Sequence, residues 1–363
     1  MSHTFKFTDD AGVEHTMDLA RGTVTYSDKS GQLITMDLGQ SDVHIDQALA
    51  NYAAGFRFAD TGLIGDDAVP AVPVPKASDK FYTWGKDDVF QLADDISVSP
   101  GGVVKELNPT LSSTSFSTVP YGLGSFIPTE ISGNQDAPLN VEMQAVAMIL
   151  GKLRLARENR IAQLLLTAAN WTGGYAAAAV AKWNGGVGSD PVGDILKLKE
   201  SSLTPVNALA MSERTWHAMI TNAQFQKYFA AKSTFAPAMG VSTENASRLF
   251  ADLLGVDRIL VGKRKKKLTP TTYGYVWGDN VAGGYAEAGM PMNGQTIATA
   301  KTFRWSGADG SVPDGTVQGG FLVRSYFDPK RGPRGGRMIV VTHNDADVMT
   351  SVFAGGLITG AHA

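Results

Sequence analysis

The sequence predicts an α+β fold organised around one unusually long helix, and three features of the 363-residue chain lead to this prediction. Apolar residues recur at helical spacing between residues 136 and 171. Helices and strands alternate between residues 190 and 261, as in an α/β unit. Residues 1–40 and 86–127 have no helical period and no apparent core of their own, so something outside them must cover them.

The composition is that of a folded protein without cysteine chemistry. Hydrophobic residues make up 43% of the chain, charged residues 18%, and the net charge is -3, so no overall field attracts nucleic acid or a membrane. The absence of cysteine excludes disulfides, thiol catalysis and cysteine-type zinc sites. No apolar run reaches the ~18 residues of a membrane span, and no signal peptide is recognisable. We therefore expect assembly in a cytoplasm and no membrane partner.

The first forty residues contain an internal repeat. The tetrad Thr16–Leu19 recurs nineteen residues later as Thr35–Leu38, and the Asp/Gly turn before it recurs with it. Each copy places β-prone residues on both sides of a turn and therefore predicts a β-hairpin. A single two-stranded hairpin is marginal in water, so the two hairpins must pack on each other or on something else.

Two further segments read as extended arms. The prolines between residues 68 and 76 force an extended path, and residues 78–84 predict a strand. Residues 86–127 contain only short β-prone runs separated by glycine and proline. Since such segments cannot bury themselves, we infer that other copies of the chain bury them, which implies a large obligate interface. The expected inter-subunit contacts are Val103, Val104, Lys105, Phe116, Val119, Phe5 and Phe7.

The long helix is expected over residues 137–170. Asp136 can accept from the free N–H groups of its first turn, where Pro138 is also well suited, and the glycines after Trp171 end it. About 32 residues at about 1.5 Å each give a rod of roughly 48 Å. The helix is apolar on two sides, which fits either a helix buried in a large domain or a spine covered from two sides.

Several caps and strands are predicted in the second half of the chain. Asp190 and Ser212 are expected to cap two helices, and a third helix is expected to begin at Thr243. The predicted strands are residues 206–211, 258–261, 273–277, 302–305, 321–327 and 337–342.

Signals for catalysis are weak. None of the six histidines has a metal-binding spacing, and no nucleophile-elbow motif is present. His343 lies beside Asp345 and Asp347, which we interpret as a polar turn after a strand and not as an acid–base or metal cluster. We expect no enzyme activity, no catalytic or metal-binding residues and no cofactor.

The basic residues leave two interpretations open. The run Lys263–Lys267 favours a solvated hairpin tip over a nucleic-acid site, because no aromatic residues interleave with it. On the long helix, four cations cluster around Glu158. Arg157 lies within the apolar stripe, where an unpaired charge is costly. Either a neighbouring element pairs with these cations, or they form a lumen face that meets nucleic-acid phosphates. The four are Lys152, Arg154, Arg157 and Arg160.

Short motifs spread over the chain occur in a fixed order. They are Ala59-Asp60 through Pro70, Pro73-Val74 and residues 76–82; Ala137-Pro138-Leu139, Leu153, Glu158 and Ile161-Ala162; residues 211–216, 253–256, 259–262 and 276–279; and residues 352–358. In this order they resemble the tailed-bacteriophage major capsid proteins of the Hong Kong 97-like fold, over roughly residues 45–363. The resemblance implies a fold with an N-terminal arm, an extended β-hairpin loop, a peripheral domain with a long spine helix and an α/β axial domain.

The resemblance also sets the expected domain boundaries. Residues 1–40 form the tandem hairpin repeat, which is additional to the family's arm. The expected order then continues with the N-arm and first strand at 41–85; the extended loop at 86–127; the peripheral domain at 128–188 and 321–347, with the spine helix at 137–170; and the axial domain at 189–320 and 348–363.

The implied function is structural. Subunits of this family form hexamers and pentamers that close into an icosahedral shell around double-stranded DNA, with a portal and scaffolding or decoration proteins as further partners. The protein is then expected in the virion, and in the host cytoplasm during assembly. Two alternatives stay open: a nanocompartment shell that encloses cargo enzymes, and a soluble α/β enzyme. Some family members cross-link a loop lysine to a neighbour's asparagine, but nothing identifies a partner for Lys105, so no cross-link is predicted.

Overall fold

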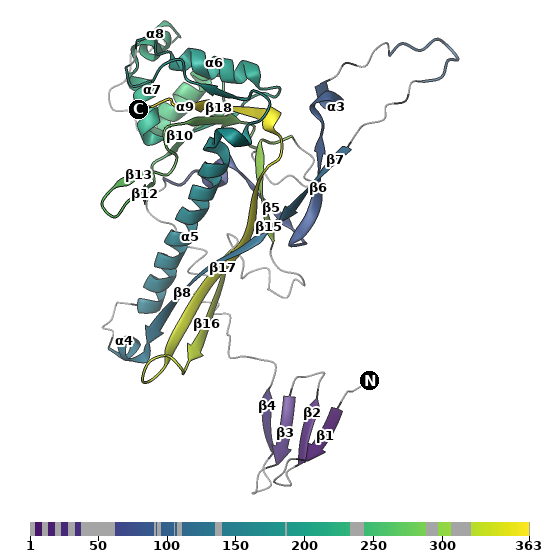
Figure 1. Ribbon diagram of the computed structural model, residues 1–363, viewed down its shortest axis with the longest axis vertical. Helices are drawn as coiled ribbons and strands as arrows, with labels where there is room; N and C mark the ends of the chain where they lie inside the picture. Colours follow the sequence, from purple (N-terminus) through teal and green to yellow (C-terminus); the bar gives the residue numbers. More distant parts are fainter. Residues whose placement is uncertain are drawn as a thin grey trace.

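The structure is a computed structural model, and it has the predicted α+β character (Figure 1). It describes residues 4–8, 14–18, 23–27, 33–37, 62–90, 92, 96–104, 106, 111–134, 140–185, 187–232, 243–287, 297–305 and 321–362.

One long strand organises a five-stranded sheet, called the long sheet below. β17 (Gly336–Met349) pairs antiparallel with β16 (Leu322–Asp328) and with β8 (Val119–Pro128). Its last residues pair with β15 (Ala300–Trp305), and β5 (Ala71–Val74) adds to β15 in parallel. The proline-rich segment is therefore extended, as predicted, but it is a hydrogen-bonded strand of this sheet.

The spine helix is shorter than predicted and begins at a different cap. α5 (Val141–Leu166) is capped by Asn140, whose side chain accepts from the backbone N–H of Met143 at 3.1 Å. Asp136, the predicted cap, lies outside the described residues. The helix stops at Leu166, and a single 3₁₀ turn (Ala168–Asn170) follows in place of the predicted last turn.

The two halves of α5 pack in different cores. Its first half lies along the long sheet (Figure 1). There Leu150 and Leu153 pack with Ile339 of β17. Its second half enters a different core, where Ile161 packs with Trp277. One helix therefore connects two cores, but the predicted cover of its opposite side is not seen within the described chain, where Met148 is 65% exposed.

The second core belongs to a mixed five-stranded sheet, called the mixed sheet below. Its strands are, in order, β11 (Arg258–Gly262), β10 (Ala208–Ser212), β14 (Val281–Gly284), β18 (Gly355–Thr359) and β9 (Ala176–Ala178). Four helices gather at this end of the molecule: α6 (Pro191–Ser201), α7 (Glu213–Thr221), α8 (Ala223–Lys232) and α9 (Thr243–Leu254) (Figure 1). The side chains of Asp190 and Ser212 cap α6 and α7, as predicted.

Two strands lie in a sheet other than the one that the expected boundaries give them. β9 falls within residues 128–188 but belongs to the mixed sheet, and β15 falls within 189–320 but pairs with β17 of the long sheet. Both pairings join residues that are far apart in the sequence, so no local pattern signals them.

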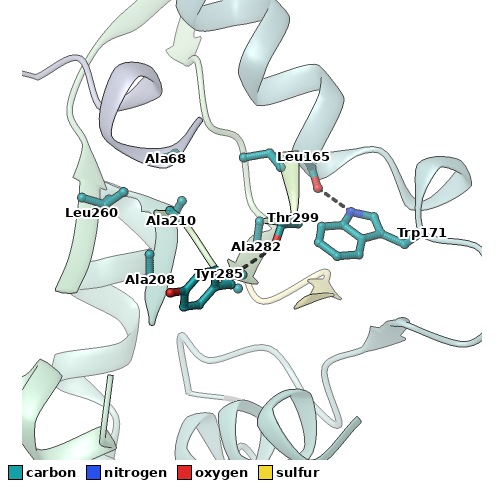
Figure 2. Close-up of a pocket in the computed structure, with 12 residues that line it drawn as sticks. Ala68, Leu165, Trp171, Ala208, Ala210, Leu260, Ala282, Tyr285 and Thr299 are labelled. Atoms are coloured by element: carbon teal, nitrogen blue, oxygen red, sulfur yellow. Dashed lines mark hydrogen bonds between the residues drawn. The ribbon is translucent and has the colours of Figure 1, made fainter. Parts of the chain in front are cut away.

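A small cavity marks the place where α5 meets the mixed sheet (Figure 2). It measures about 20 Å³ and is lined by Leu165 and Trp171 together with small side chains such as Ala210 and Ala282. The indole N–H of Trp171 donates to the carbonyl of Leu165 at 2.7 Å, which closes one side (Figure 2). A space of this size holds about one water molecule, so it is a packing defect and not a substrate site.

The N-terminal repeats form a separate sheet. β1 (Thr4–Thr8), β2 (Glu14–Asp18), β3 (Thr23–Ser27) and β4 (Leu33–Asp37) pair antiparallel in this order, and we call them the N-terminal sheet. Each repeat is one hairpin, as predicted. The register between β2 and β3 joins the two hairpins into one four-stranded sheet.

The extended loop is smaller than predicted. β6 (Ser78–Trp84) pairs antiparallel with β7 (Leu111–Ser117), and a short helix, α3 (Lys86–Phe90), follows β6. We call residues 78–117 the arm and residues 85–110 its tip. The last part of the predicted loop is β8, which pairs with β17 over ten residues, and Ile127 is buried in the core. The prediction that all of 86–127 lacks intrachain cover is therefore wrong for residues 119–127.

The basic run lies on a hairpin, close to the predicted place. β12 (Lys265–Lys267) pairs with β13 (Tyr273–Tyr275), so the lysines lead into the tip and do not form it. No helix in the described parts of the chain combines the length and apolarity that crossing a membrane requires.

Candidate functional site

The arm carries the largest concentration of exposed apolar side chains in the described chain. Eight of the nineteen large hydrophobic residues that are exposed lie between residues 82 and 104. Val103 is 93% exposed and Leu92 is 89% exposed, although clustered apolar surface of this kind is unfavourable in water. The eight residues are Tyr82, Val89, Phe90, Leu92, Ile96, Val98, Val103 and Val104.

The base of the arm is anchored within its own chain. Phe116 of β7 is buried and stacks on Phe303 of the long sheet, with ring centroids 4.3 Å apart. Phe81 of β6 joins them at 5.2 Å from Phe303. The arm therefore leaves the body from an aromatic base, and Figure 1 shows the β6–β7 pair leading from there to α3.

The predicted inter-subunit residues fall into three groups. Val103, Val104 and Val119 are exposed and therefore available for such a contact, which stays a prediction. Phe116 contradicts it, because Phe303 of the same chain covers its ring. The other three are not tested. Lys105 lies outside the described residues, and only the backbone is described at Phe5 and Phe7.

Behind the arm, buried charges connect α5 to the long sheet. Arg157 lies 3.3 Å from the carboxylate of Asp345, which is fully buried, and also pairs with Asp66 of the short helix α2 (Gly65–Ala68). Arg304 of β15 donates to the other oxygen of Asp345 at 2.9 Å. Arg157 is therefore an intrachain ion-pair residue, and the prediction that it faces the lumen is wrong.

The next turn of the helix repeats this arrangement. Arg160 donates to Asp347 at 3.2 Å, and its guanidinium lies over the ring of Tyr121 at 3.7 Å. Asp347 also accepts from the hydroxyl of Thr302 at 2.7 Å. Arg160 is thus engaged within its own chain, which again contradicts a lumen role. We call Arg157, Arg160, Arg304, Asp66, Asp345 and Asp347 the charged junction.

The remaining two cations of the helix differ from each other. Arg154 is half-buried, with its guanidinium 5.8 Å from the ring centre of Phe321. Lys152 is exposed. Of the four predicted phosphate-facing residues, Lys152 alone keeps an exposed side chain.

The sequence places Glu158 among the cations of the helix, but its hydrogen-bond partners lie elsewhere. Its buried carboxylate accepts from the backbone N–H groups of Ile64 and Gly65, at 2.8 and 2.7 Å, and from the indole N–H of Trp277 at 2.6 Å. Burial raises the pKa of Glu158, and these three donors oppose the shift. The residue therefore ties the segment that begins at residue 62 to the spine helix and to the mixed-sheet core. It is not the counter-ion of the helix arginines.

His343 and Asp345 lie within β17, so the predicted polar turn is wrong. His343 is buried between the rings of Tyr121 and Phe321. Burial, supported by the three neighbouring arginines and opposed by Asp345, lowers the pKa of His343 to about 4. Burial raises the pKa of Asp345, but Arg304 and Arg157 outweigh it and hold that pKa below its usual value. The pair is a neutral ring beside a carboxylate that arginines already engage, which suits a structural role.

The described residues contain no group of three or more potential ligands that could hold a metal ion. A larger hollow, of about 330 Å³, lies beside Trp183 and Asn222. The amide of Asn222 is already used there: it donates to the carbonyl of Trp183 and to the hydroxyl of Ser189, and it accepts from the N–H of Gln224. These pairings hold the loop against α8 and leave this amide without a role in ligand binding.

Neither a protein-family model nor a curated protein matches the sequence, but solved structures match the fold. A phage-related protein from Bordetella bronchiseptica RB50 superposes with a TM-score of 0.65 at 21% identity, covering 89% of this chain and 99% of that chain. The capsid of the cyanophage P-SCSP1u gives a TM-score of 0.51 at 12% identity, covering 85% and 90%. The chain has the fold of a phage capsid protein.

This result confirms the α+β capsid fold that the sequence resemblance predicted. A virus-like particle from Pyrococcus furiosus also matches, with a TM-score of 0.45 at 9% identity over 86% of this chain and 96% of that chain. Within the capsid fold, the charged junction and Glu158 hold the spine helix, and the arm is the exposed apolar element.

The charged junction should be a major source of stability. Replacing Asp345 with Asn leaves Arg157 and Arg304 in a buried site without their shared counter-ion, which should cost about 3–5 kcal/mol. The measurement is urea unfolding of the unassembled subunit. The matched control is Asp279→Asn, which breaks the half-exposed Arg214–Asp279 pair at 3.8 Å and should cost less than about 1 kcal/mol. Equal losses in the two variants would contradict this account.

His343 should make stability depend on pH in a defined window. Because its folded pKa is about 4 and its ordinary pKa is 6.5, the unfolded chain binds the additional proton between these values. Stability should therefore be intact above pH 6.5 and should fall as the pH drops towards 4, with the melting temperature lower by roughly 5 °C. In His343→Gln, which cannot take up this proton, the slope in that window should largely disappear. An unchanged slope would refute the assignment.

Proposed function

We propose that this chain is a major capsid protein, whose copies assemble as hexamers and pentamers into an icosahedral shell around double-stranded DNA. The observation that carries the proposal is the exposed apolar arm on a chain with a phage capsid fold. A shell subunit needs such a segment, because the energy that closes the shell must come from surface that each subunit leaves uncovered until assembly.

The amount of uncovered surface is sufficient for this purpose. Burying one aliphatic or aromatic side chain contributes about 1.5–3 kcal/mol. The eight exposed residues of the arm could therefore contribute on the order of 10 kcal/mol per subunit, before the cost of ordering the tip is subtracted. Every subunit repeats the contact, which suits a closed assembly.

We propose further that the protein is a structural component without an enzymatic role. His343 and Asp345, the most enzyme-like pair, are engaged with the arginines and rings around them. Exposed cations such as Lys152 would make the non-specific contacts with packaged DNA. A portal, and scaffolding or decoration proteins, would be further partners, and the protein would reside in the virion after assembly in the host cytoplasm.

The direct test is the size and content of the purified particles. Size exclusion with light scattering should give megadalton particles, and their absorbance ratio should indicate nucleic acid. Megadalton particles that hold cargo enzymes and no nucleic acid would favour a nanocompartment shell. A stable 38.5 kDa monomer that stays unassembled under crowding and added salt would contradict the proposal.

The arm itself can be tested by shortening it. Trp84 and Leu111 are register partners at the ends of β6 and β7, so an Asn-Gly turn can replace residues 85–110 without disturbing either strand. This variant should keep the melting temperature of the unassembled subunit, because the aromatic base and β8 remain. It should form no closed particles in electron micrographs.

A matched pair of point variants separates apolar burial from other effects of the arm. Val103→Ser with Val104→Ser should weaken assembly strongly. Asp87→Ser with Glu106→Ser, which changes two exposed polar residues of the same tip, should leave assembly intact. If the polar pair impairs assembly as much as the apolar pair, burial of apolar surface is not what drives it.

A further inference from the structure

The N-terminal sheet has two chemically different faces. Alternate residues of a strand lie on the same face, and the register of the four strands aligns these positions across the sheet. Phe5 is paired with Met17, and Met17 with Val24, which is paired in turn with Met36. The positions that share this face are Phe5, Phe7, His15, Met17, Val24, Tyr26, Ile34 and Met36, and we call them the apolar face.

The opposite face is polar. With the exception of Leu33, its positions are occupied by hydroxyl or charged residues. They are Thr4, Lys6, Thr8, Glu14, Thr16, Asp18, Thr23, Thr25, Ser27, Leu33, Thr35 and Asp37. A sheet with this pattern has one face for water and one face for burial.

The repeat doubles the apolar face. Positions nineteen residues apart are equivalent, so Phe7 corresponds to Tyr26 and Met17 corresponds to Met36. The second hairpin therefore widens the same face and leaves the polar face polar. No Lys, Arg, Asp or Glu lies on the apolar face, so two such faces can meet without charge repulsion.

The four strands pair only with one another, and none of the other described helices or strands packs closely against them. A sheet with an apolar face becomes stable when a second layer covers it, at a distance of about 10 Å.

We propose that the apolar face docks against the same face of a second copy of the chain, so that N-terminal sheets pair face to face between subunits of the shell. The inference rests on the proposed shell function. A face that meets its own copy forms an isologous contact, in which each residue set serves both partners. This is the simplest cover available to a sheet that every subunit carries.

The size of the face indicates when the pairing forms. Four strands about 4.8 Å apart and five residues long, at about 3.4 Å per residue, give a face of roughly 300 Å². A stable interface buries about 800 Å² per partner. The pairing is therefore too small to hold two free subunits together. In a shell, many copies are held close together at high local concentration, so many weak pairings form and their free energies sum.

The absence of cysteine permits a direct test in the full-length protein. Val24→Cys introduces a cysteine at the centre of the apolar face. Thr25→Cys introduces a cysteine on the polar face of the same strand. Both variants are treated with a short bis-maleimide, first as unassembled subunits and then as particles, and are run on denaturing gels.

The expected result is a cross-linked band at twice 38.5 kDa from Val24→Cys particles, with loss of the monomer band. Thr25→Cys particles, and unassembled subunits of either variant, should stay monomeric. Particles of Val24→Cys that form normally but give no dimer would overturn this inference alone, as would equal cross-linking of Thr25→Cys. If the wild-type chain forms no particles at all, the proposed function fails and this inference fails with it.

Discussion

The buried ion pairs between α5 and β17 constrain the rest of the structure. Arg157 and Arg160 lie one helical turn apart, and Asp345 and Asp347 lie two residues apart on the strand, so helix and strand match in one register. Removing such charges from water is costly, and the cost is recovered only when each charge meets its partner. Sliding the helix along the sheet would leave buried charges unpaired, so the junction fixes where the helix lies.

The consequences reach both ends of the molecule. Because α5 is fixed on the long sheet, its second half enters the mixed-sheet core at a defined place, where Glu158 holds the segment beginning at residue 62. That segment leads into β5 and then into the arm. The arm therefore leaves the body from an aromatic base whose position the junction determines, while residues of its tip such as Leu92 and Val103 are almost fully exposed. Rigid placement of an uncovered apolar segment is what a shell subunit requires.

Local features of this fold could be predicted from the sequence, and long-range features could not. Ser212 and Asp190 act through N–H groups three residues away, so their capping roles are visible in the sequence. The tandem hairpins are similarly local. By contrast, Arg157 pairs with Asp345 on a strand that is distant in the sequence, and no sequence spacing predicts such a partner.

The errors in the predicted site have the same physical origin. Phe116 lies in a segment with no periodic pattern, and only its contact with Phe303 of a distant strand shows that it is buried. His343 and Asp345 are polar, and polarity usually marks turns, but a strand can carry charges through a core when arginines from other elements meet them. The exposed valines of the tip were predictable, because nothing in their own segment could cover them.

The central claim is that a second copy of the chain covers the tip of the arm. The most direct measurement is the rate at which a maleimide labels Val103→Cys, the only thiol in such a variant, before and after assembly. Val103 is 93% exposed in the subunit, so labelling should be fast there and should slow strongly in closed particles. Equal rates in subunit and particle would show that the tip stays in water and would contradict the account.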